Sequence, residues 1–237
     1  HVSIDAYKKR LDENLERIRI GLSDGKYQPQ AIRRVEIPKP GTNQTRPLGI
    51  PTVRDRTVQA ALVNVIEPIF EVGFAEHSYG FRPNRGAKDA LRRVDGLLKE
   101  GFTCVVDADL KGYFDTIPHQ VIMERVEEKI SDGRILELIR SFLEQPVETA
   151  DGTKKSKQGT PQGAVLSPLL ANMVLDPLDK LMEAEGFHMT RYADDFVIQC
   201  KNQEDAEKAL QLVRAWVNNN GLELHPDAVQ GLEGVVQ

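Results

Sequence analysis

Arg191-Tyr192-Ala193-Asp194-Asp195-Phe196-Val197-Ile198 sets two adjacent carboxylates between apolar residues. The pattern predicts a β-hairpin over residues 188–200, with Asp194 and Asp195 at its tip. Two neighbouring carboxylates held against a core need positive charge, and their hard oxygens suit Mg²⁺ or Mn²⁺. A plain acidic turn between two strands gives the same pattern, so the rest of the chain has to decide between the two interpretations.

A second group of carboxylates lies at the end of the strand predicted from Phe102 to Leu110. Asp107 and Asp109 occupy alternate positions there, so they share one face of the strand. From residue 102 onward the predicted order is strand, helices, strand, strand, helix, strand, which is a βαββαβ sheet with helices on one face. Its first and third strands are neighbours, so Asp109 meets the Asp194-Asp195 turn at one edge. A pair of divalent ions about 3.5–4 Å apart, as in polymerases and nucleases, fits this arrangement.

Basic and turn-rich segments lie before this sheet. Apolar alternation predicts a hairpin at about 32–50, and its tip carries Lys39 and Arg46, which suits it to close over an anion. Residues 77–86 combine aromatics, glycines and arginines, a composition typical of a template track and also of an ordinary structured loop. A polar loop at 158–168 leads into a long apolar helix. Periodicity and end signals predict other helices at 4–22, 54–71, 87–98, 119–130, 134–144 and 204–219, and a short strand at 222–224.

The composition of the 237 residues, 40% hydrophobic and 28% charged, is typical of a soluble globular protein. The sequence has no apolar run of about 18 residues and no basic-then-apolar start, so we expect neither a membrane span nor a signal peptide. Two cysteines and five scattered histidines argue against a disulfide framework or a zinc site and favour the cytoplasm. Because the first residue is His1 and not Met, we expect a piece of a longer protein.

The net charge of −5 hides an uneven distribution. Residues 1–60 carry 12 Lys and Arg against 7 Asp and Glu, whereas residues 161–237 carry 5 against 12. The basic N-terminal part suits phosphate binding, and the acidic C-terminal part suits metal ions. An overall acidic charge therefore does not exclude a nucleic-acid partner.

At this point the motifs resemble a known family. Tyr192-Ala193-Asp194-Asp195 is similar to the Tyr-x-Asp-Asp box of reverse transcriptases, residues 109–115 to their first catalytic motif, and residues 159–163 to the loop that frames the nucleotide. Three wider runs resemble the group II intron reverse transcriptases, or maturases: Ile37-Pro38-Lys39-Pro40 with residues 46–56, Ser78-Tyr79-Gly80-Phe81-Arg82-Pro83, and Leu166-Ser167-Pro168-Leu169-Leu170-Ala171-Asn172. The resemblance covers about residues 10–225 in unbroken order.

The resemblance implies an α+β polymerase right hand. Residues 1–101 are expected to form basic fingers with the nucleotide-closing hairpin at about 32–50, and residues 102–237 a ferredoxin-like βαββαβ palm with a fingers-like insertion at about 119–165. The family's thumb is absent from this sequence, so we expect weak or distributive synthesis from these residues alone. The implied activity is RNA-directed DNA synthesis by two-metal nucleotidyl transfer onto a primer 3′-hydroxyl, with assistance to intron splicing.

The resemblance also implies roles for single residues. Asp109, Asp194 and Asp195, with the backbone carbonyl of Leu110, would hold two Mg²⁺ or Mn²⁺ ions. The incoming dNTP would be bound by Lys39 and Arg46 at its phosphates, Gln162, and Phe114 as the steric gate. Asp107 and Asp115 are interpreted as structural. Contacts with an RNA template or a DNA or RNA primer are expected at Arg54, Arg56, Gly80, Phe81, Arg82 and Tyr192.

The sequence departs from the family in places, and other interpretations stay open. Ala228 stands where the family usually has lysine after His225-Pro226-Asp227, and Ala164 replaces a common glycine. A reverse transcriptase linked to CRISPR adaptation or to a diversity-generating element is an alternative to an intron protein that binds a structured intron RNA. A non-catalytic RNA-binding maturase is another.

The two cysteines give a further expectation. Cys104 lies five residues before Asp109 and Cys200 five after Asp195, on strands predicted to be antiparallel neighbours. We therefore expect the two thiols to approach each other below the carboxylates, and to be reduced and structural.

Overall fold

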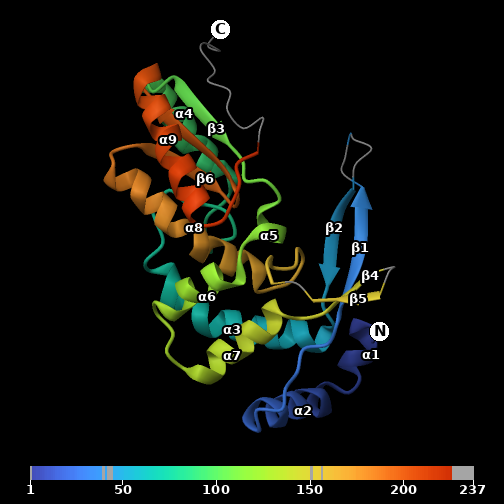
Figure 1. Ribbon diagram of the computed structural model, residues 1–237. Helices are drawn as coiled ribbons and strands as arrows, with labels where there is room; N and C mark the ends of the chain where they lie inside the picture. Colours follow the sequence, from blue (N-terminus) through green and yellow to red (C-terminus); the bar gives the residue numbers. More distant parts are fainter. Residues whose placement is uncertain (1, 39–40, 42–44, 150–151, 156, 226–237) are drawn as a thin grey trace. The chain divides into compact units, whose positions relative to one another are not determined.

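The computed structural model describes residues 2–38, 41, 45–149, 152–155 and 157–225 (Figure 1). The chain forms two compact units, each made of two segments: His1–Ile69 with Pro118–Ser167, and Phe70–Ile117 with Pro168–Gln237. The expected boundary near residue 101 is therefore wrong. Residues 70–101 belong to the second unit because α4 (Ala87–Lys99) packs against two strands of its sheet.

The first unit combines a four-stranded sheet with helices. The strand order is β2-β1-β4-β5, and β1 pairs with β2 antiparallel from Arg33 opposite Ile50 to Pro38 opposite Thr45. The hairpin expected at about 32–50 is therefore confirmed. The strands are β1 (Ile32–Pro38), β2 (Thr45–Ile50), β4 (Val147–Thr149) and β5 (Gly152–Lys154), and the helices are α1 (Ile4–Lys8), α2 (Leu11–Ser23), α3 (Val53–Glu71), α6 (His119–Glu127) and α7 (Gly133–Leu143).

Two features of the first unit differ from the sequence prediction. The helix predicted over 4–22 is two helices, because Arg10 leaves the helical region with φ −128° and ψ 41°, and its guanidinium binds Glu13 in the first turn of α2. The strands β4 and β5 were not predicted. Each has three residues, too few for a periodic signal, and β4 is stabilised by parallel pairing with the distant β1.

The second unit contains the predicted palm. Its sheet has the order β3-β7-β6, all antiparallel, with β3 (Cys104–Ala108), β6 (His188–Tyr192) and β7 (Asp195–Cys200). Leu224 continues the sheet beside the first strand, because it forms an antiparallel β-bridge with Leu110. The resulting order places the first strand next to the third and the fourth, as the ferredoxin-like βαββαβ arrangement requires.

Two helices of the βαββαβ unit cover one face of this sheet. Arg191, Phe196, Ile198 and Cys200 point to that face by register; Arg191 contacts α8 (Ser167–Ala184), and Cys200 lies beside Asp205 of α9 (Gln203–Asn219). The other face carries Asp107, Tyr192 and Asp195, because side chains alternate along a strand. Neither α8 nor α9 therefore covers the face that carries these carboxylates. The short helix α5 (Tyr113–Thr116) follows β3.

Membrane insertion has no support in the described part of the chain. None of its helices combines the length and the apolar character that a bilayer span needs.

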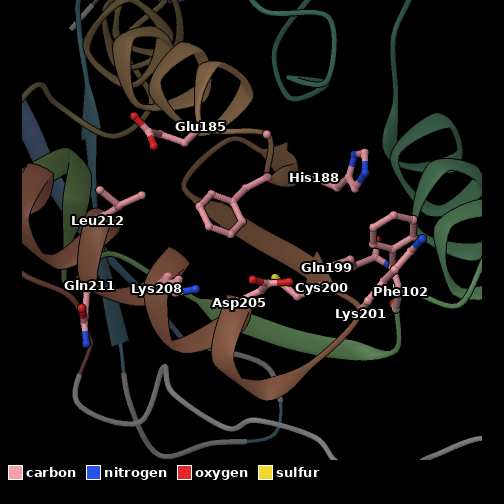
Figure 2. A pocket seen from close by; sticks show the side chains of 12 residues that line it. Phe102, Glu185, His188, Gln199, Cys200, Lys201, Asp205, Lys208, Gln211 and Leu212 are labelled. Carbon is pink, nitrogen blue, oxygen red and sulfur yellow. Dashed lines mark hydrogen bonds between the residues drawn. The ribbon is translucent and has the colours of Figure 1, made fainter.

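The two cysteines are directly opposite each other in the sheet. Cys104 of β3 pairs in register with Cys200 of β7, and both thiols are free, which confirms that they are neighbours. Cys200 is only 3% exposed, although it lies beside a groove of about 820 Å³ between the end of α8, β7 and α9. Figure 2 shows the carboxylate of Asp205 close to Cys200, and burial together with this carboxylate raises the pKa of the Cys200 thiol to about 11.

We expect the two thiols to differ in reactivity. Alkylation proceeds through the thiolate, so the buried Cys200 with its raised pKa should resist iodoacetamide at pH 8, whereas the half-buried Cys104 should react. Mass spectrometry should find one label on the folded protein and two after unfolding in guanidinium chloride. The Cys104→Ser variant is the control and should stay unlabelled while folded. Equal labelling of both thiols in the folded protein contradicts this prediction.

Candidate active site

The candidate site is built on the turn between β6 and β7. Tyr192 pairs with Asp195, so Ala193 and Asp194 form a two-residue hairpin loop. Ala193 has a φ of 60°, a conformation that L-residues other than Asn and Asp seldom adopt. Such turns match the twist of the two strands, and the strained residue must be held by its surroundings.

The carboxylates of this turn and of β3 act on one another electrostatically. Burial, followed by the charges of Asp195 and Asp109, raises the pKa of Asp194 to about 6. Burial, followed by the charges of Asp109 and Asp107, raises the pKa of Asp195 as well. The predicted neighbours Asp109, Asp194 and Asp195 are thus brought to one place. Asp107 is exposed and adds a fourth negative charge that the sequence interpretation had assigned to structure alone.

The chemistry of this group suits a hard divalent cation. The charge of Arg191 lowers the pKa of Asp194 but does not offset burial and the neighbouring carboxylates, and a bound cation would supply the further positive charge. Within the described ranges, no three His, Cys, Asp or Glu side chains already converge in the geometry of a metal cage. The residues therefore fit a divalent ion chemically, without a preformed cage.

The backbone bridge beside Asp109 leaves the Leu110 carbonyl unused. The bridge to the last strand uses the Asp109 carbonyl, which accepts from His225 N at 2.8 Å, and the Lys111 N–H, which donates to the Glu223 carbonyl at 2.9 Å. Neither bond uses the Leu110 carbonyl. The side chain of Leu110 is buried, so its expected role could involve only its backbone, and that role stays a prediction.

Gly80 packs closely against the backbone of the turn. A Cβ atom built on Gly80 would lie 2.2 Å from Ala193 N, 2.9 Å from Ala193 Cα and 3.0 Å from the carbonyl carbon of Tyr192. Only glycine allows the two backbones to approach this closely. The structure therefore gives Gly80 a role in packing the turn, which differs from the template contact expected from the sequence.

The other residues expected to contact template or primer divide into exposed and buried ones. Phe81 is 51% exposed and Tyr192 is 41% exposed, so both rings are available for stacking. Arg82 is buried: it pairs with Glu71 at 2.8 Å and donates to the carbonyls of Ala75 at 2.6 Å and Ser78 at 2.9 Å. Its donors hold the loop together, a role that differs from the template contact expected from the sequence.

The proposed steric gate lies next to one of these aromatic residues. Phe114 of α5 is half-buried, and its ring meets the Phe81 ring edge-on with centroids 6.3 Å apart. It also meets the Tyr113 ring at 5.8 Å, and Tyr113 is anchored by a hydrogen bond from its hydroxyl to the Ala171 carbonyl. Packing on a buried neighbour fixes the position of Phe114, as a steric gate requires.

The loop with Gln162 is held within the first unit by β2. The Gly49 N–H donates to the Gln162 carbonyl at 2.7 Å, and a Cβ on Gly163, which has a φ of 98°, would lie 2.7 Å from a methyl of Leu48. Gln162 itself is half-buried. Lys39 lies outside the described residues, as does Ala228, and only the backbone of Arg46 is described, so their expected roles stay predictions.

Two arginines at the start of α3 have different surroundings. Arg54 donates to the Gln28 carbonyl and to the fully buried Asp55, which also accepts from Tyr27 and from the Gln30 N–H. Arg56 is exposed. Arg56 is therefore available to a phosphate, whereas Arg54 mainly stabilises the first unit.

The comparison with known families decides the identity of the fold. The family model described as reverse transcriptase (RNA-dependent DNA polymerase) matches residues 37–233, most of the chain. The chain belongs to the reverse transcriptase family. The resemblance recognised from its motifs is thereby confirmed, and the α+β fingers and palm with it.

Relatives of this reverse transcriptase domain include group II intron proteins. It is 41% identical to protein YkfC of Escherichia coli (strain K12) over 73% of this chain and 46% of that protein. It is 39% identical to the group II intron-encoded protein LtrA of Lactococcus lactis subsp. cremoris over 72% of this chain and 28% of that protein. The chain thus spans less than half of the length of these curated relatives.

Solved structures agree with this assignment. A chain of the partial Cas6-RT-Cas1--Cas2 complex matches 87% of this chain and 37% of its own length, with a TM-score of 0.51 and 27% identity. Telomerase from Candida albicans matches 98% of this chain and 46% of its own chain with a TM-score of 0.63, at 13% identity. The second likeness shows a shared fold alone.

One residue that contacts the turn was missed by the sequence interpretation. Arg191 is 1% exposed, and its guanidinium donates to the carbonyl of Ala193 in the turn at 2.8 Å. Its position directly before Tyr192 was visible in the sequence, but a lone arginine in a strand gives no sign of whether it is buried.

Proposed function

We propose that this chain catalyses RNA-directed DNA synthesis, transferring nucleotides from dNTPs onto a primer 3′-hydroxyl. The observation that carries the proposal is the group of carboxylates at the hairpin tip and the end of β3, Asp109, Asp194 and Asp195, whose charges act on one another at a strained turn. Membership of the reverse transcriptase family supports it. An acidic turn of merely structural use has no need of a third carboxylate from another strand.

Asp109, Asp194 and Asp195, with the Leu110 carbonyl, are the groups that would hold divalent ions, Mg²⁺ in the first place and Mn²⁺ as a substitute. When bound, such ions neutralise the charge that develops at the attacking and leaving oxygens of an in-line displacement. The chain's own contribution is to present the carboxylates from a rigid sheet. Phe114, fixed against Tyr113, would exclude a ribose 2′-hydroxyl, and the exposed Phe81 and Tyr192 would stack on bases.

The nucleic-acid partners belong to the same proposal. An RNA template with a DNA or RNA primer is the substrate class that the family implies. The similarity to a group II intron-encoded protein supports a structured intron RNA as a further partner, with a role in splicing. The exposed Arg56 and, by family resemblance, Lys39, Arg46 and Gln162 would contribute to binding the template and the nucleotide.

Primer extension tests the proposal. With an RNA template, a labelled DNA primer, dNTPs and Mg²⁺, the wild-type chain should lengthen the primer, and Asp109→Asn should reduce the rate at least about 10³-fold because a charge needed in the transition state is lost. The matched control is Asp95→Asn, which removes an exposed carboxylate of α4 that pairs with Lys99. It should extend the primer at the wild-type rate.

The alternative functions give different results in the same experiment. A non-catalytic RNA-binding maturase predicts no primer extension by the wild-type chain and equal RNA affinity for all three proteins. Synthesis that is unaffected by Asp109→Asn contradicts the proposed site. A reverse transcriptase of the kind found in the Cas6-RT-Cas1--Cas2 complex predicts the same extension, and is separated from an intron protein by whether the full-length protein binds intron RNA.

A further inference from the structure

A buried ion pair lies directly beneath the carboxylate turn. Arg191 and Asp179 are 1% and 6% exposed, and the Arg191 Nε atom lies 2.8 Å and 3.0 Å from the two carboxylate oxygens of Asp179. Nη2 also donates to this carboxylate. Burying both charges costs several kcal/mol for each ion, and such pairs are often no more stabilising than apolar residues of equal size. Stability alone therefore gives little reason for this pair.

The remaining donors of Arg191 reach the turn itself. Nη1 donates to the Ala193 carbonyl at 2.8 Å and to Asn172 Oδ1 at 2.9 Å. Asn172 in turn donates from Nδ2 to the Gly80 carbonyl at 2.9 Å. One planar guanidinium thus joins α8, the turn and, through Asn172, the glycine on which the turn packs.

The backbone of Arg191 makes the same connection. Its N–H donates to the His77 carbonyl at 3.0 Å, and its carbonyl accepts from Tyr79 N at 2.9 Å. The segment before Gly80 is therefore attached to the last part of β6. The strained Ala193, with its φ of 60°, is held on one side by this segment and on the other by the Arg191 side chain.

We propose that Arg191 is a positioning residue for nucleotidyl transfer: by fixing the Ala193 carbonyl, it sets the turn conformation that places Asp194 and Asp195. Asp179 and Asn172 orient the guanidinium. This inference rests on the proposed function, because the placement matters only if the carboxylates act in synthesis. Lysine cannot replace arginine here, since one ammonium group cannot reach Asp179, Asn172 and Ala193 in the planar arrangement of the guanidinium.

A double variant separates positioning from stability. Arg191→Met alone leaves Asp179 as an uncompensated buried charge and is expected to destabilise the fold strongly. Arg191→Met with Asp179→Leu removes both charges at similar volume, so its unfolding midpoint in urea should return to near the wild-type value. The Ala193 carbonyl still has no donor in the double variant. We therefore expect its kcat to stay about 10²-fold below wild type, since small misplacements of reacting groups have effects of this size, with the KM for the primer–template little changed.

A measurement independent of activity completes the test. Backbone chemical shifts should report a positive φ for Ala193 in the wild type and its loss in the double variant. Retention of that φ, or a kcat within about twofold of wild type, overturns the proposal. If the wild type makes no DNA at all, the proposed function fails, whereas the chemical shifts still decide whether Arg191 sets the turn.

Discussion

Of the substitutions that add one methyl group in the second unit, Gly80→Ala is expected to disrupt the candidate active site most. The added Cβ would lie 2.2 Å from Ala193 N and within 3.0 Å of two more backbone atoms. These atoms belong to backbone that is tied by hydrogen bonds to Arg191, so they cannot move aside as a flexible side chain would. We expect a loss of about 3 kcal/mol in the free energy of unfolding, at the upper end for overpacking, because no rotamer change relieves the overlap.

The same change should displace Asp194 and Asp195, because the turn itself must move to make room. We therefore expect primer extension by Gly80→Ala to fall at least about 10²-fold. Urea unfolding and primer extension measure the two effects separately. The activity should be compared at temperatures where the variant is still folded.

Gly96→Ala is the matched control, because it adds the same methyl group in the same unit. No heavy atom lies within 4 Å of the Cβ position at Gly96, in the interior of α4. Alanine should stabilise that helix by roughly 0.5–1 kcal/mol and leave synthesis unchanged. If Gly80→Ala behaved like Gly96→Ala, the close approach of the two backbones would not exist in solution.

Local patterns were sufficient to predict the elements of the palm. The alternation around Asp194 and Asp195 predicted the hairpin of β6 and β7, and the predicted helix at 204–219 agrees with α9 at Gln203–Asn219. The position of Asp109 beside the turn followed from the order of elements, because a βαββαβ sheet allows few arrangements of its strands. Sequence periodicity is informative for α9 because its buried residues, Ala206, Ala209, Val213 and Val217, recur at helical spacing.

Interactions between distant residues were not predictable in the same way. Gly80 was interpreted as part of a template track because nothing in residues 77–86 shows that the turn packs on it. Arg82 was expected to contact the template or primer and Arg191 was given no role, yet both are buried with carboxylates. A sequence shows that a side chain is charged, but its partner, here Glu71 or Asp179, is fixed only by the tertiary fold. The short strands β4 and β5 depend on pairing with β1 for the same reason.

Asp194→Asn is expected to abolish synthesis and to stabilise the fold. The pKa of Asp194 is raised from 3.8 to about 6 in the folded chain, mainly by burial and then by Asp195 and Asp109. A raised pKa means that the folded state holds the proton more tightly than the unfolded state, so the penalty is absent below about pH 4 and complete above about pH 6. The full shift corresponds to about 3 kcal/mol, and the partial exposure of Asp194 reduces this to roughly 1–2 kcal/mol. Asparagine, which has the same shape without the charge, should recover that amount at pH 7.

Divalent ions should reverse the order of stability of these two proteins. An ion that binds the folded state alone stabilises it, so Mg²⁺ at pH 7 should raise the unfolding midpoint of the wild type far more than that of Asp194→Asn. Asp95→Asn serves again as the control and should respond to Mg²⁺ like the wild type. A lower free energy of unfolding for Asp194→Asn than for wild type without Mg²⁺ contradicts the prediction. The carboxylates whose burial destabilises the palm are then the same groups that a bound ion would turn into a source of stability, and this is why the proposed cation site need not favour the fold without its ions.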